Sequence, residues 1–294
     1  MTTLPPDAAG TPPAGTGLAR TPQRGAGSTG APVQSHEQRQ VAEGFGADAA
    51  RYDRARPSYP ARLISRIVAA SPGPDLLDAG SGTGISARLF QAAGCRVLGV
   101  DPDPRMAAAA RAAGTETETA RIEDWDPAGR TFDTVTAAQA WHWVDPVRGA
   151  AKAAQVLRPG GRLAVFWNVF EPPAELRAAF AAVFARVLPE SPARGFWSQP
   201  ALSLYRTAMG GKAADGMRQA GRFGAPEEWL TRWERPYTSA EWTDLVPTTG
   251  GFSRLPASVQ AQLLDGLATA VDAAGGVFTM GYATLTVTAA KLRR

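Results

Sequence analysis

The stretch LLDAGSGTG at residues 76–84 decides the fold of this chain. Its apolar start predicts a short buried strand, which is followed by an acidic residue and by a glycine-rich turn that opens a helix. About twenty residues later a second apolar run, VLGVD at residues 97–101, ends on a carboxylate. Two such strand ends are typical of a nucleotide-type cofactor site at the carboxyl edge of a parallel sheet.

The spacing of the glycines narrows the kind of cofactor. Dinucleotide-binding turns favour G-x-G-x-x-G/A, and here the last position is Ile85. Asp78 would also repel a pyrophosphate, and no Lys-Ser/Thr pair follows the glycines as in a P-loop. S-adenosylmethionine, which has a ribose, an adenine, a sulfonium and an ammonium group but no phosphate, fits best.

The expected contacts follow from this cofactor. Glycines let the backbone approach a ligand closely, because they have no Cβ. Asp101 is expected to accept hydrogen bonds from the ribose hydroxyls. The residues of the first turn expected at the cofactor are Asp78, Gly80, Ser81 and Gly82.

At this point the sequence resembles the class I S-adenosylmethionine-dependent methyltransferases, in their small-molecule branch known as methyltransferase type 11. The resemblance is strong over residues 41–168 and weak over 226–294. The blocks that support it are LLDAGSGTG (76–84), VLGVDPDPRM (97–106), ARIEDWD (120–126), FDTVTAAQAWHWVD (132–145), LRPGGRLAVFWN (157–168) and the upstream FGADAARYDRARPSYP (45–60). It implies methyl transfer by direct in-line displacement to an O, N or C atom of a small molecule, for example in secondary metabolism.

The resemblance also implies roles for residues outside the glycine turn. Ile122 and Glu123 are expected to hold the adenine, with Asp124 as a competing candidate, and the backbone carbonyl of Gln139 to accept from the cofactor ammonium. Arg56 is a candidate clamp for the cofactor carboxylate, because a guanidinium suits bidentate contact. Tyr52 would lie on the same helical face, four residues earlier.

His142 is the one histidine expected inside the folded part. It is a candidate general base in catalysis. The alternative is a structural role in shaping the loop after the fourth strand. The cap aromatics Phe170, Phe196, Trp197, Tyr205, Phe223 and Trp229 are expected either to line an apolar substrate pocket or to form the core of the cap.

Strands alternate with helices from residue 75 to 168, which predicts an α/β fold with a mostly parallel sheet covered on both faces. We expect a Rossmann-like seven-stranded sheet with an antiparallel last strand. The expected parts are a disordered Pro/Gly/Thr-rich tail (1–36) and a methyltransferase domain (37–294), made of lid helices (37–70), a cofactor-binding core (75–168), a helical cap inserted after strand five (170–225) and the rest of the sheet (226–294). Within the cap we expect a helix at 171–188 and an irregular stretch at 189–225.

Composition limits the setting and the partners. The chain has 294 residues, one cysteine, two histidines and a formal net charge of +4, with its basic residues scattered. We expect no disulfide, metal site, membrane span or nucleic-acid partner, and a cytoplasmic protein whose oligomeric state the sequence leaves open. Three alternatives remain: a non-catalytic cofactor-binding or scaffold protein, an RNA or protein methyltransferase, and an NAD-dependent oxidoreductase.

Overall fold

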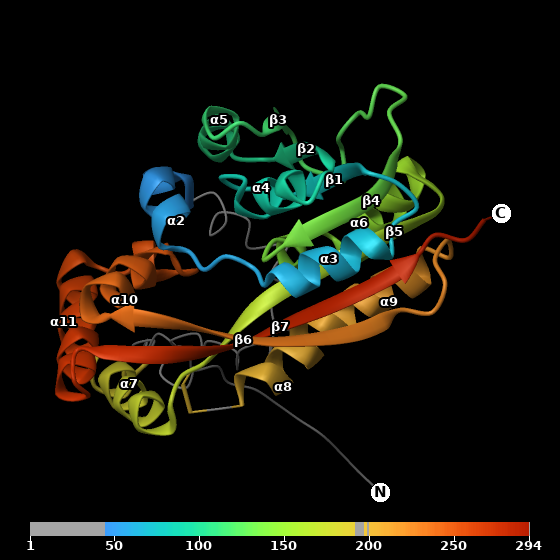
Figure 1. Cartoon of the computed structure of the whole chain (residues 1–294). Helices are drawn as coiled ribbons and strands as arrows, with labels where there is room; N and C mark the ends of the chain where they lie inside the picture. Colours follow the sequence, from blue (N-terminus) through green and yellow to red (C-terminus); the bar gives the residue numbers. More distant parts are fainter. Residues whose placement is uncertain (1–44, 192–196, 199, 294) are drawn as a thin grey trace, which may run out of the picture. The chain divides into compact units, whose positions relative to one another are not determined.

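The computed structural model describes residues 45–191, 197–198 and 200–293. The expected tail at 1–36 lies outside the described residues, as does the first part of the expected lid helices. Within the described chain a seven-stranded sheet has the order β3-β2-β1-β4-β5-β7-β6 (Figure 1). The strands are β1 (Asp75–Ala79), β2 (Arg96–Asp101), β3 (Glu116–Thr119), β4 (Phe132–Ala138), β5 (Leu157–Glu171), β6 (Glu227–Thr238) and β7 (Val277–Ala290).

Strand direction determines where the ends of the strands meet. Strands β1 to β5 pair in parallel, so their carboxyl ends lie at one edge of the sheet. Strand β7 runs antiparallel between β5 and β6, which confirms the expected antiparallel last strand. Since β5 pairs with β7 as far as Glu171↔Gly281, these long strands continue beyond the edge where β1 and β4 end.

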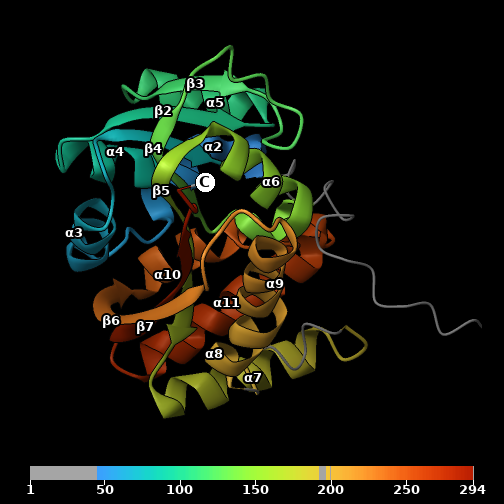
Figure 2. The same ribbon diagram turned by 90° about the vertical axis from the view of Figure 1, so that its right-hand side faces the viewer.

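The two faces of the sheet are covered by different helices, as Figure 2 shows. Leu76 of β1 belongs to a buried cluster with residues of α3 (Ala61–Ala69) and α4 (Ile85–Ala92). Its neighbour Leu77 belongs to a second cluster with residues of α6 (Pro146–Val156) and α9 (Lys212–Gln219). Neighbouring strand residues point to opposite faces, so the apolar run at β1 fills both layers.

A third buried cluster lies beyond the parallel part of the sheet. It joins the ends of β6 and β7 to α7 (Ala174–Val187), α10 (Ser239–Leu245) and α11 (Ala257–Ala273). Trp242 stacks on Phe180 with ring centroids 5.4 Å apart, and both side chains are buried. This cluster forms a second layer of structure beside the edge where the glycine turn lies (Figure 1).

The segment between β5 and β6 is more helical than the sequence suggests. We expected residues 189–225 to be irregular, and this was wrong for 201–219. That stretch forms α8 (Ala201–Tyr205), a π-helix (Arg206–Gly211) and α9. The small residues of this stretch give a weak helical signal in the sequence, but packing requires them. A Cβ at Gly216 of α9 would come 2.2 Å from the carbonyl oxygen of Pro146 in α6. The small residue allows the two helices to pack closely.

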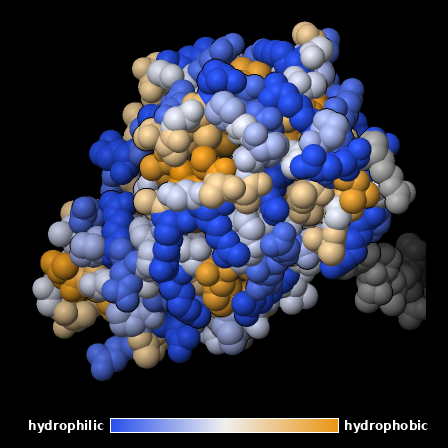
Figure 3. Space-filling view, turned by 45° about the vertical axis from the view of Figure 1, so that its right-hand side comes forward, coloured by the Kyte–Doolittle hydropathy of each residue, from blue (hydrophilic) through white to orange (hydrophobic). Residues whose placement is uncertain are grey.

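The remaining helical elements connect these layers. They are a 3₁₀ turn (Phe45–Asp48), α2 (Ala49–Ala55), α5 (Pro104–Ala112) and three short 3₁₀ turns (Trp141–Trp143, Val246–Thr248, Phe252–Arg254). None of the helices in the described residues is long and apolar enough to cross a membrane. The face in Figure 3 is mostly hydrophilic, with small separate apolar patches.

Candidate active site

The glycine turn after β1 has a backbone that side chains tolerate poorly. Gly80, Gly82 and Gly84 have φ values of +69°, +56° and +86°. A Cβ at Gly80 would lie 2.5 Å from the Cβ of Ala140, whereas a Cβ at Gly82 would meet no protein atom within 4 Å. Gly80 therefore allows the loop after β4 to approach the turn, and Gly82 leaves open space in the cavity beside it.

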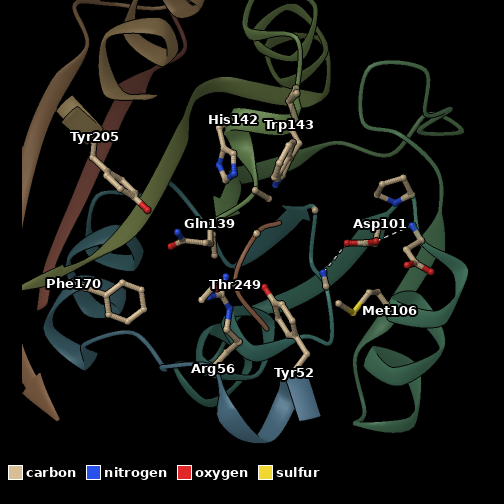
Figure 4. Close-up of a pocket in the computed structure, with 18 of the residues that line it drawn as sticks. Tyr52, Arg56, Asp101, Met106, Gln139, His142, Trp143, Phe170, Tyr205 and Thr249 are labelled. Atoms are coloured by element: carbon tan, nitrogen blue, oxygen red, sulfur yellow. Dashed lines mark hydrogen bonds between the residues drawn. The ribbon is translucent and has the colours of Figure 1, made fainter. Parts of the chain in front are cut away.

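Asp101 at the end of β2 is fixed against this turn. Its Oδ2 accepts from the Gly82 amide at 2.8 Å, and its Oδ1 accepts from the Asp103 amide at 2.9 Å (Figure 4). The carboxylate is buried, and this burial raises its pKa to about 6 despite the two amide donors. Each oxygen keeps a further lone pair, and the residue lines the cavity.

Asp78 and Ser81 lie differently from the expectation. The Asp78 carboxylate is fully buried beneath the turn and accepts from Ser86 Oγ at 2.6 Å and Thr136 Oγ1 at 2.8 Å. Burial raises its pKa to about 6. The Ser81 side chain lies against Gly99 of β2. Neither residue is part of the cavity wall, so their direct contact with a cofactor stays a prediction, and the observed contacts support the turn from below.

The helix before the sheet brings Tyr52 and Arg56 to the cavity. Helix α2 is tied to the glycine turn by Asp53, which accepts from Thr83 Oγ1 at 2.6 Å and pairs with Arg88 at 2.7 Å. Arg56 lies 5.0 Å from the centre of the Tyr52 ring, and both residues line the cavity. No carboxylate in the described chain forms a salt bridge with Arg56, so its charge is suited to an anionic ligand group.

The turn after β3 separates the two acidic candidates. Ile122 and Glu123 line the cavity, and Glu123 also accepts from the Asp145 amide at 3.0 Å. Asp124 faces outward and pairs with Arg148 at 2.6 Å. Of the two acidic candidates for the adenine, Glu123 and not Asp124 therefore lies at the cavity.

Gln139 has an unusual backbone at the end of β4. Its φ is +56°, which is strained for a residue with a Cβ. Its Oε1 accepts from the Asn168 amide at 2.9 Å. The Asn168 side chain donates to the Ser58 carbonyl at 2.9 Å and accepts from Thr284 at 2.7 Å. This network connects the loop at Gln139 to the lead-in segment and to β7.

His142 lines the cavity two residues after Ala140. Its Nδ1 accepts a hydrogen bond from the indole Nε1 of Trp167 at 3.2 Å. Burial, with a smaller effect of the Arg56 charge, lowers the pKa of His142 to about 4. The imidazole is therefore neutral near pH 7.

One cavity of about 390 Å³ includes all of the expected site residues except Asp78 and Ser81. Its second half is apolar and aromatic, and Figure 4 shows Phe170 and Tyr205 on the side away from Asp101. The apolar lining residues that belong to or pack against the third buried cluster are Phe170, Phe184, Trp197, Trp242, Val246 and Leu267, and Tyr205 lies on the same side of the cavity as Phe170. The cavity wall thus combines the carboxyl edge of the sheet with the third buried cluster.

The cap aromatics divide between the two roles expected for them. Phe170, Trp197 and Tyr205 line the cavity. Phe223 and Trp229 are core residues, and Phe196 lies outside the described residues. The sequence analysis missed the contribution of α10 and α11, for which Trp242 in an amphipathic helix was the available signal.

Comparisons with known proteins agree with this geometry. Residues 77–165 match the family model described as a methyltransferase domain. An uncharacterized methyltransferase of Mycobacterium tuberculosis is 41% identical over 133 residues, which are 44% of this chain and 54% of that protein. Nocamycin O-methyltransferase of Saccharothrix syringae is 37% identical over 181 residues, 55% of this chain and 63% of that one. The chain therefore spans somewhat more than half the length of these relatives.

A solved structure supports the same fold. It is described as a putative type II methyltransferase from Anaeromyxobacter dehalogenans, with a TM-score of 0.58 and 21% identity over 81% of this chain and 99% of that one. Residues 77–165 thus match a methyltransferase domain, and the sheet around them has the fold of the class I, S-adenosylmethionine-dependent methyltransferases. The cofactor of this class is S-adenosylmethionine. The open space at Gly82 and the cavity-lining carboxylate of Asp101 fit its ribose, and the guanidinium of Arg56, which forms no salt bridge among the described residues, fits its carboxylate.

Proposed function

We propose that this protein transfers a methyl group from S-adenosylmethionine to an O, N or C atom of a small apolar molecule. The observation that supports it most is the single cavity with two chemically different halves. One half has the glycine turn and Asp101, and the other has an aromatic wall. Such a cavity has room for a polar cofactor beside an apolar acceptor.

The residues at the polar half have distinct roles in this proposal. Asp101 would accept from the ribose hydroxyls, and Ile122 with Glu123 would hold the adenine. Arg56 would bind the cofactor carboxylate, and the carbonyl of Gln139 would accept from its ammonium group. Asp78 would support the turn through Ser86 and Thr136 in addition to any contact of its own.

Positioning is the main contribution of the chain to the reaction. The bound cofactor supplies a methyl group already activated on a sulfonium centre. The aromatic wall orients the acceptor and keeps water away from it, and such alignment is worth several kcal/mol. A protein base is required only where the acceptor atom must lose a proton during attack.

The wider setting belongs to the same proposal. A single cysteine and scattered basic charge favour a cytoplasmic protein without a nucleic-acid partner. We propose that the helices between β5 and β6 act as the cap over the acceptor, within a methyltransferase domain at 37–294. The nocamycin relative is named an O-methyltransferase, which supports an oxygen atom as acceptor, and we propose secondary metabolism as the setting.

Calorimetric titration with S-adenosylhomocysteine tests the cofactor half, with NAD as the control ligand. Micromolar binding of the first and none of the second is the expected result. Incubation with methyl-labelled cofactor and a panel of aromatic metabolites then tests for transfer. Binding without turnover on any acceptor would favour the non-catalytic scaffold alternative, and binding of neither ligand would refute the proposal.

A further inference from the structure

We infer that His142 recognises the methyl acceptor as a hydrogen-bond donor, through Nε2–H, and that it does not serve as a general base. This inference rests on the proposed function and adds a substrate class to it. The acceptor is an apolar, largely aromatic molecule with an oxygen lone pair, of a carbonyl, enolate or phenolate group, next to the methylated atom.

The bond from Trp167 fixes the position of the imidazole proton. An indole nitrogen can only donate, so the Nδ1 of His142 must present its lone pair to it. A neutral imidazole has one N–H, which is then on Nε2. Trp167 is completely buried in β5, and His142 lies in the 3₁₀ turn (Trp141–Trp143) that follows β4.

A base role would require a different arrangement. To accept a proton at Nε2, His142 would first need its own proton on Nδ1, where it would oppose the indole N–H of Trp167. An imidazolium ring has a proton on both nitrogens, so its Nδ1–H would also oppose the indole N–H of Trp167. The nearby charge of Arg56 also disfavours a second cation.

The surroundings of His142 set the substrate class. The carboxylates that line the cavity in the described chain are Asp101, the last residue of β2, Asp103 after it, and Glu123 after β3. Figure 4 shows His142 on the same side of the cavity as Gln139 and Tyr205. This end of the cavity has the Nε2–H donor of His142, and none of the three carboxylates lies beside it. It therefore suits an oxygen that accepts a hydrogen bond, either an uncharged carbonyl or an oxygen that is already ionised.

The tautomer can be measured without any ligand. The chain has two histidines, so His36→Gln leaves one set of imidazole ¹⁵N signals. At pH 7 we expect a protonated Nε2 and an unprotonated Nδ1. In Trp167→Phe, which lacks the indole donor, we expect a mixture of the two neutral tautomers. A protonated Nδ1, or a ring that titrates near pH 6.5, would overturn the inference.

Ligand recognition is tested with a matched pair of probes. Binding of 1-acetonaphthone and of 1-ethylnaphthalene is followed by tryptophan fluorescence in the presence of saturating S-adenosylhomocysteine. We expect the ketone to bind about tenfold more tightly, as for one buried hydrogen bond. His142→Leu should abolish this preference, whereas His142→Gln, which keeps an N–H donor but cannot act as a base, should retain most of it.

The outcomes separate the two proposals. Failure of S-adenosylhomocysteine to bind would refute the proposed function, and with it the acceptor role of His142. Normal binding of S-adenosylhomocysteine with equal affinity for both probes, or with a preference that survives in His142→Leu, would refute this inference alone. Loss of labelled methyl transfer in His142→Gln with probe preference intact would restore the base role and overturn ours.

Discussion

Gly80→Ala tests whether the close approach of two loops holds the site together. At φ +69° an L-residue is strained by about 1–2 kcal/mol. The new Cβ would lie 2.5 Å from the Cβ of Ala140, an overlap that costs about 1–3 kcal/mol more. Because alanine also restricts the unfolded chain, which offsets about 0.4–1 kcal/mol, we expect a net loss of about 1–4.5 kcal/mol in the free energy of unfolding, or roughly 3–15 °C in Tm.

The chain provides matched controls for each contribution. Gly94 has φ +90° and open space around its Cβ position, in a turn that is not part of the cavity. Gly94→Ala therefore measures backbone strain without a steric overlap. We expect a loss of about 1 kcal/mol, because the lower conformational entropy of the unfolded alanine variant offsets part of the strain. Gly82→Ala should lose as little stability, yet weaken S-adenosylhomocysteine at least about tenfold, because its Cβ points into the open space where the cofactor is expected.

The assays are urea denaturation and calorimetric titration of the three variants. Ala140→Gly in the Gly80→Ala background should recover part of the lost stability, since the next nearest atom, Ala140 Cα, is 3.8 Å away. If Gly80→Ala is no less stable than Gly94→Ala, or the double variant recovers nothing, the steric reasoning is refuted.

Three further variants test the buried polar groups. Asp101→Asn should weaken the binding of S-adenosylhomocysteine by about 2 kcal/mol. In the parent we expect the affinity to fall by up to about tenfold per pH unit below pH 6, as Asp101 becomes protonated, and the variant should lack this dependence. Parallel pH profiles of parent and variant would contradict this. The raised pKa of Asp78 means that the native state binds the extra proton between pH 4 and 6. The parent is therefore expected to lose stability as the pH rises through that window. Relative to the parent, the free energy of unfolding of Asp78→Asn should rise by up to about 3 kcal/mol from pH 4 to pH 8, as measured by urea titration. A difference between variant and parent that stays constant with pH would contradict this. Asn168→Ala should lower stability by about 1–3 kcal/mol, since it leaves the buried Thr284 hydroxyl without its acceptor and removes the bond to the Ser58 carbonyl; a loss below 1 kcal/mol would show that the network is not stabilising.

The cofactor half of the site was predictable because its signals are local. The glycine turn, the carboxylate of Asp101 and the strand ends are specified within short stretches, and parallel pairing brings them to one edge. The direction of Asp78 could also have been predicted. In β1 it shares the face of Leu76, which packs under α4, and Ser86 of α4 is its partner.

The acceptor half was less predictable because it is assembled from distant segments. Phe170 follows the end of the predicted strand five, while Trp242 and Leu267 lie on helices whose apolar faces indicate only burial. Periodicity tells that a side chain is buried, but not whether it lines a cavity or fills a core. The Nδ1 contact of His142 depended on Trp167, a strand residue whose indole direction no local pattern indicates.

The long β5–β7 pairing explains why the two halves of the site differ in this way. Strand β5 pairs with β7 well past the residues where it borders β4, since Ala138 pairs with Phe166 and Glu171 still pairs with Gly281. This extension supports the third buried cluster beside the cofactor edge, and the Asn168 amide of β5 bonds to the Gln139 side chain of the loop after β4. Under the proposed function we therefore expect substitutions in the aromatic wall to alter the choice of acceptor, while the turn and Asp101, which form their bonds within β1, β2 and their loops, keep the proposed cofactor site intact.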